Sequence, residues 1–109
     1  MHQDPPSPVS IDRRRRIKAI DGSVRYFKVI DEIMLEHKVP EKYTRKLIYF
    51  QQIRFEDSKQ VQYRFTYYML GLKPGAKGRW VFGQYSLLLP AKELSFLLKE
   101  ARRRKWKGV

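Results

Sequence analysis

Two segments of alternating apolar and polar residues, separated by a short turn, constrain the fold of this chain more than any other feature. The first runs over residues 46–56 and the second over 61–72, and both are rich in aromatic and β-branched side chains. Such alternation is typical of strands with one buried face. The intervening Asp57-Ser58-Lys59-Gln60 has the composition of a turn. The two segments therefore predict an antiparallel hairpin.

A third strand and a helix are predicted after this hairpin. Residues 79–89 carry Trp80 and Phe82 in an extended-type pattern, and residues 91 to about 105 follow a helical one. Pro90 separates them, because proline suits the first turn of a helix. Gly83 inside the strand indicates a bulge or a close backbone approach. The buried stripe of the helix is predicted to consist of Leu94, Leu97, Leu98 and Ala101.

An earlier helix is predicted over residues 23–38. Phe27, Ile30 and Met34 recur at helical spacing there, and Ser23 is a suitable N-cap. The expected order is thus α-β-β-β-α. The simplest packing is an α+β domain in which a three-stranded antiparallel meander carries both helices on one face.

The length of 109 residues indicates one domain. We expect it to span residues 23–107. Residues 1–22 are Pro-rich and then Arg-rich, so we expect a flexible basic tail, or a short helix over residues 12–20.

The formal net charge is +13, and the cations gather in clusters. Residues 13–18 hold five Lys/Arg and no acid, and residues 99–107 hold six against Glu100. Such clusters attract nucleic acid, an anionic membrane surface or an acidic protein, although excess charge also promotes solubility.

Several classes of chemistry have no residues to support them. The chain has no cysteine, which excludes disulfides, thiol nucleophiles and cysteine-bound metals. Neither histidine has a partner in the sequence, and no nucleophile elbow or phosphate-binding loop occurs. We therefore expect no enzyme activity, metal, cofactor or small-molecule substrate. No apolar run is long enough for a membrane span or a signal core, so we expect an intracellular, cytoplasmic protein.

Two nuclease arrangements are the enzymatic alternatives. Ile48-Tyr49 and Tyr68-Met69-Leu70-Gly71 resemble the paired motifs of GIY-YIG nucleases, although the spacing is longer and no glycine precedes Ile48. Glu56 and Asp57, with Lys59 close by, would supply a metal-dependent nuclease. Adjacent strand residues point to opposite faces, however, so turn formation explains these acids as well.

The last part of the chain resembles the end of sheet-plus-helix single-strand-binding coactivator domains. The resemblance covers about 30 residues: a KPG-KG loop, a strand ending S-L-x-L-P, and an amphipathic helix. It is a likeness of fold. The predicted order of elements also resembles that of double-stranded-RNA-binding domains. Those domains place lysines at the start of the last helix, where this chain reads Pro90-Ala91-Lys92-Glu93.

These features predict a nucleic-acid-binding module for DNA or RNA, with single strands slightly favoured. If odd-numbered strand residues face the helices, the other face of the sheet presents arginines for phosphates and aromatic rings for stacking on bases. The basic ends would add sequence-independent contacts. The predicted site residues are Arg54, Arg64, Tyr68, Lys73, Lys77, Arg79, Trp80, Arg102, Arg103, Arg104 and Lys105.

The alternative is a protein-interaction module. In that case Ile48, Phe50, Trp80 and Phe82 are buried in a homodimer or against a partner, because a sheet face with four large apolar groups is rarely left exposed. The positive charge would then serve solubility or attract an acidic partner.

Overall fold

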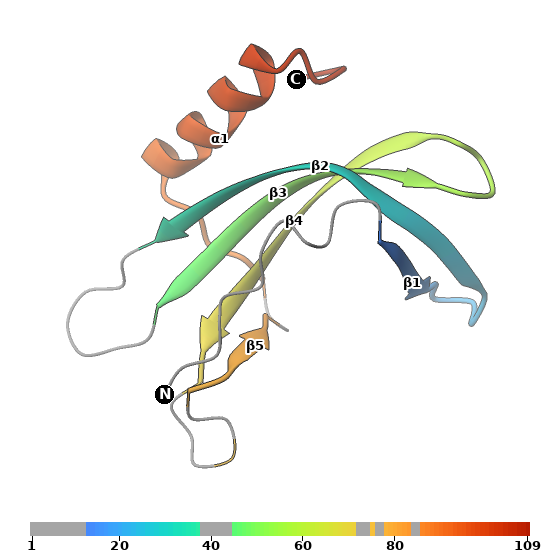
Figure 1. Ribbon diagram of the computed structural model, residues 1–109, viewed down its shortest axis with the longest axis horizontal. Helices are drawn as coiled ribbons and strands as arrows, with labels where there is room; N and C mark the ends of the chain where they lie inside the picture. The colour runs from blue at the N-terminus through green and yellow to red at the C-terminus, as the bar shows by residue number, and fades with distance from the viewer. Residues whose placement is uncertain (1–12, 38–44, 72–74, 76–77, 84–85) are drawn as a thin grey trace.

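The structure, a computed structural model, describes residues 13–37, 45–71, 75, 78–83 and 86–109. Five strands form one antiparallel sheet in the order β1-β2-β3-β4-β5, which curls into a half-barrel (Figure 1). A single helix among the described residues, α1, lies on the outer side of the curl. The elements are β1 (Arg14–Lys18), β2 (Val24–His37), β3 (Lys46–Phe55), β4 (Val61–Leu70), β5 (Trp80–Phe82) and α1 (Ala91–Arg103).

The predicted hairpin is confirmed, since β3 and β4 pair antiparallel from Lys46–Met69 to Arg54–Val61. The predicted C-terminal helix is confirmed as α1. Glu93 in its first turn and basic residues in its last turn both complement the helix dipole.

The predicted meander with helices on one face is wrong, because residues 24–37 form β2, the longest strand. β2 pairs with β3, and their register shifts between Val29 and Asp31. A bulge at Ile30 inserts one residue and reverses which face each later side chain meets. Phe27, Ile30 and Met34 therefore recur at spacings of three and four residues without a helix.

The N-terminal prediction is wrong as well, since Arg14–Lys18 is neither a flexible tail nor a helix but the edge strand β1, paired with β2. A tight turn joins the two strands: Gly22 has φ +88°, and Ala19 N donates to Ser23 O at 2.8 Å. Ser23, predicted as a helix cap, instead donates its backbone N–H and its hydroxyl to Asp21.

The predicted third strand is shorter than expected, because β5 spans only Trp80–Phe82. Gly83 follows it, and its N–H donates to the Tyr67 carbonyl at 2.7 Å. A Cβ at Gly83 would overlap the Tyr67 ring. The glycine therefore marks a close backbone approach, as the sequence predicted.

The sheet has a buried cluster on each face. On the outer face, Ile33, Ile48, Phe50 and Tyr67 pack with Leu97, Ala101 and Trp106 from the C-terminal segment. On the inner face, Phe27, Val29, Ile53 and Phe55 form a second cluster. The curl of the sheet lets a chain of this length bury apolar side chains on both faces.

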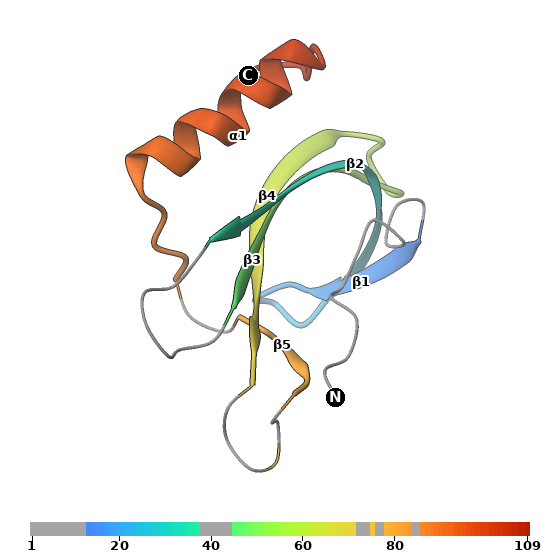
Figure 2. The same ribbon diagram turned by 60° about the vertical axis from the view of Figure 1, so that its left-hand side comes forward.

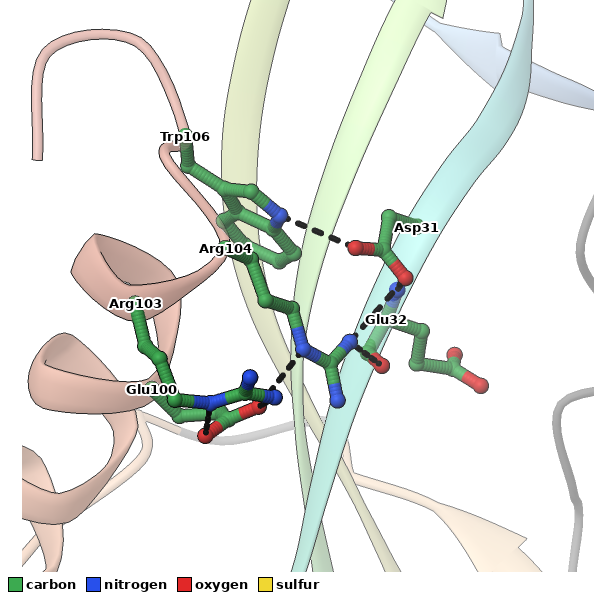
Figure 3. Close-up of polar contacts among 6 residues, drawn as sticks. All are labelled: Asp31, Glu32, Glu100, Arg103, Arg104 and Trp106. Carbon is green, nitrogen blue, oxygen red and sulfur yellow. Dashed lines mark hydrogen bonds and ion pairs between the residues drawn. The ribbon is translucent and has the colours of Figure 1, made fainter.

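Asp31 on β2 fastens the C-terminal segment to the sheet (Figure 3). It accepts a hydrogen bond from Trp106 Nε1 at 2.9 Å and another from Arg104 Nη1 at 3.1 Å. Arg104 also donates to the Glu32 carbonyl at 3.0 Å. The bulge at Ile30 turns Asp31 toward the helix, so that this junction can form.

Candidate nucleic-acid interface

The predicted sheet arginines lie on opposite faces. In the β3–β4 register Arg54 pairs with Val61, and Gln51 pairs with Arg64. Paired residues share a face, so even-numbered residues of β3 lie with odd-numbered residues of β4. The expectation that even-numbered residues form one exposed face is therefore wrong: Arg54 is on the outer face and Arg64 on the inner one.

Arg64 and Tyr68 belong to the inner face. Arg64 Nε donates to Gln51 Oε1 at 2.6 Å, and its guanidinium carbon lies 4.7 Å from the centroid of the Phe27 ring. The Tyr68 ring packs edge-on against Tyr49 at 5.7 Å and against Phe82 at 5.3 Å. Both residues are half-buried and share no surface with Arg54.

The arginines at the helix end are partly structural. Arg103 and Arg104 both bind the Glu100 carboxylate, at 2.6 Å and 2.7 Å. These two guanidiniums lower the pKa of Glu100 to about 2. Arg102 and Lys105 are exposed.

The remaining predicted residues lie near β5 or outside the described ranges. Arg79 donates to the Gly75 carbonyl oxygen. Trp80 lies beneath the Arg45 guanidinium, at 5.2 Å from its ring centroid. Lys73 and Lys77 fall outside the described residues.

A row of cations crosses three strands of the outer face. Arg14 pairs with Lys28, and Lys28 pairs with Arg54. Glu56 binds Arg14 through two hydrogen bonds, of 2.7 Å and 3.1 Å. Lys28 and Arg54 are exposed and make no ion pair within the described part of the chain. Like charges directly opposite each other destabilise a sheet. Glu56, whose pKa the nearby Lys28 charge helps to lower, offsets part of this repulsion, and it is already bound to Arg14.

Two hollows extend this row toward the C-terminus. One, of about 520 Å³, is lined by Lys28, Ile30, Arg54, Phe55, Glu56 and Lys59. The other, of about 450 Å³, is lined by Lys59, Gln60, Val61, Tyr63 and Lys107. Lys59 lines both, so the two hollows are neighbours on the surface. We call Arg14, Lys28, Arg54, Lys59 and Lys107 the basic strip.

Aromatic rings support the strip at both ends. The Arg14 guanidinium lies 3.6 Å from the centroid of the Tyr26 ring. The Tyr63 ring stacks on Trp106 at 5.7 Å with an interplanar angle of 16°, and its hydroxyl donates to the Lys107 carbonyl. These contacts fix the backbone that carries the cations.

The acids considered for a nuclease are held by arginines from different strands. Glu56 binds Arg14 of β1, whereas Asp57 binds Arg25 of β2 at 2.8 Å. Each arginine lowers the pKa of its carboxyl partner. Among the residues that the structure describes, no three His, Asp or Glu side chains gather in a way that could hold a metal ion. Within the same ranges, no helix has the length and apolar character needed to cross a membrane.

Comparisons with protein families, with curated proteins and with solved structures find no match to this chain.

Proposed function

We propose that this chain is a nucleic-acid-binding module whose basic strip contacts phosphates. The observation that carries the proposal is the pairing of Lys28 with Arg54, two exposed cations directly opposite each other, above a hollow that Lys59 also lines. Side chains in this arrangement repel one another in the free protein. A polyanion lying along the strip would relieve that repulsion, whereas a neutral ligand would not.

The chemistry of the strip favours sequence-independent binding. Lysine and arginine side chains read the charge of the backbone, and phosphate contacts position a nucleic acid without identifying its bases. Arg14 already shares its charge with Glu56. Lys28, Arg54, Lys59 and Lys107 therefore supply the net attraction, equivalent to about four phosphates.

The test compares two variants with equal loss of charge. Lys28→Gln/Arg54→Gln removes the centre of the strip, and Lys92→Gln/Lys99→Gln removes two exposed lysines of α1. For single strands each phosphate contact contributes about 0.7 to the slope of log affinity against log salt. At about 0.1 M salt, the loss of two contacts should therefore weaken binding roughly 25-fold.

Fluorescence anisotropy with labelled single- and double-stranded DNA and RNA measures this difference. The strip variant should bind roughly 25-fold more weakly than the wild type. The helix variant should bind less than about threefold more weakly, through its long-range charge alone. Equal losses in both variants would show that only net charge matters, and the proposed interface would be wrong.

A protein-interaction module is the second candidate, because apolar side chains remain exposed beside α1. Phe65 stacks on Phe50 at 4.3 Å and yet stays 39% exposed. On α1, Leu94 is 38% and Phe96 51% exposed. Light scattering separates the two functions. A dimer that Phe65→Ser converts to a monomer, and that ignores oligonucleotides, would favour assembly.

A further inference from the structure

A row of polar side chains crosses the inner face between apolar neighbours. Glu32, Gln51 and Arg64 lie opposite one another on β2, β3 and β4. Gln51 Nε2 donates to Glu32 Oε1 at 2.6 Å, and Arg64 Nε donates to Gln51 Oε1 at 2.6 Å. Glu32 and Gln51 are buried. Burying charged side chains is less favourable for stability than burying apolar ones. We therefore expect this row to serve a role other than packing.

Arg15 adds a second guanidinium to this face. In the β1–β2 register it pairs with Phe27, the residue over which the Arg64 guanidinium lies, and the curl brings β1 around toward the inner side (Figure 2). Both arginines thus lie against Phe27. Burial lowers the pKa of Arg64, and the charge of Arg15 lowers it further. Arg15 Nε is buried and has no hydrogen-bond partner.

Tyr49 supplies a third donor. Its side chain is 2% exposed, and its hydroxyl is buried without a hydrogen-bond partner. It lies in the row next to Gln51, paired with Thr66. Burial raises the pKa of the Tyr49 hydroxyl, and the nearby Glu32 carboxylate raises it further, so the hydroxyl keeps its proton and can donate.

The charge and the hydrogen-bond donors of Arg15, Arg64 and Tyr49 favour an anionic ligand. Two guanidiniums face one carboxylate, which leaves a net positive charge. Arg15 and Tyr49 each keep a buried donor without a hydrogen-bond partner, while the Glu32 Oε2 acceptor is buried on the same face. We propose that the inner face binds a phosphate group between Arg15, Arg64 and Tyr49. An oxyanion with several acceptor oxygens satisfies all three donors and balances the charge. This site lies on the opposite face from the basic strip and does not depend on it.

NMR spectroscopy of the full chain tests the site. The Nε–Hε signals of its arginines are recorded during titration with inorganic phosphate to about 10 mM, which would saturate a site of about 1 mM affinity. The Arg15 and Arg64 signals should shift and saturate, while that of Arg54 stays nearly constant. Sodium chloride of equal ionic strength should leave all three unchanged. No saturable shift at Arg15 and Arg64, or the same shift with chloride, would overturn the proposal.

Tyr49→Phe separates a binding role from a structural one. Loss of the hydroxyl should weaken phosphate binding about tenfold, because a hydrogen bond to a charged group is lost. It should also raise the thermal midpoint of the ligand-free chain by about 5 °C, because a buried donor without a partner disappears. An unchanged phosphate affinity in Tyr49→Phe would contradict the site.

The Lys28→Gln/Arg54→Gln variant is the matched control, since it alters only the outer face. Phosphate affinity at the inner face should be unchanged in it, whether or not the chain binds oligonucleotides. A nucleoside 5′-monophosphate then distinguishes two sources of the group: tighter binding than inorganic phosphate indicates a nucleotide, and equal binding indicates the free ion. Loss of the Arg15 shift in this control would place the phosphate on the strip and overturn the inference.

Discussion

Replacement of Asp31 with alanine should release the C-terminal segment from the sheet. The carboxylate accepts hydrogen bonds from Trp106 Nε1 at 2.9 Å and Arg104 Nη1 at 3.1 Å. Trp106 is 5% exposed, so its indole N–H would be left buried without a partner. α1 itself buries only Leu97 and Ala101. The junction around Asp31 therefore contributes a large share of what holds the helix in place.

The magnitude follows from these two bonds. Hydrogen bonds to charged groups contribute about 1.5–3 kcal/mol each, and solvent around the partly exposed Arg104 reduces one of them. We expect Asp31→Ala to lower the free energy of unfolding by about 2–3 kcal/mol. For a domain of this size, each kcal/mol shifts the thermal midpoint by about 4–8 °C, so the midpoint should fall by about 10 °C or more.

Arg103→Gln is the matched control, because it removes an exposed contact with the same Glu100 network. The Arg103 side chain is 71% exposed, and its partner Glu100 would remain paired with Arg104 in this variant. An exposed helix pair contributes about 0.3–0.5 kcal/mol, so the midpoint should change by only about 2 °C.

Calorimetry gives the midpoints, and hydrogen exchange of the Trp106 indole N–H reports on the junction itself. Exchange should accelerate in Asp31→Ala and remain slow in Arg103→Gln. Equal midpoints for Asp31→Ala and the wild type would refute the role assigned to this carboxylate.

Two further predictions concern stability. Ion pairs lower the folded-state pKa values of Glu56, Asp57 and Glu100, the last to about 2, so the stability they contribute is present above the unfolded pKa values of about 4 and is lost as pH falls toward 2. The thermal midpoint should accordingly fall over this range, and less steeply in Glu100→Gln; parallel curves would contradict the assignment to Glu100. Gly83→Ala should destabilise the fold by about 1–3 kcal/mol, because its Cβ would overlap the Tyr67 ring, whereas Gly75→Ala has open space around it. Similar midpoints for the two alanine variants would show that the chain moves away from Tyr67 at little cost.

The hairpin and the last helix could be predicted because their signals are local. Alternation in β3 and β4, the turn between them and the helical stripe after Pro90 each lie within one element. Gly83 was interpretable for the same reason. β2 could not be identified, because the bulge at Ile30 produces a helix-like spacing from a strand. β1 could not be identified either, since four consecutive arginines reveal nothing about the strand they pair with.

The strip was missed because it depends on register. Arg54 was predicted as a site residue, but its neighbours Arg14 and Lys28 lie on strands that the sequence did not reveal. The separation of Arg54 and Arg64 could have been foreseen. Six residues separate the paired Arg54 and Val61, and an even number of residues between two partners makes an even residue on one strand pair with an odd residue on the other.

The salt dependence of oligonucleotide affinity tests the central claim most directly. With four net contacts from the strip, the slope of log affinity against log salt should be about −3 for a single strand, and about −1.4 in Lys28→Gln/Arg54→Gln. The Lys92→Gln/Lys99→Gln variant should keep the slope of the wild type. A slope near zero, or one that both variants reduce equally, would show that phosphates do not lie along Lys28 and Arg54.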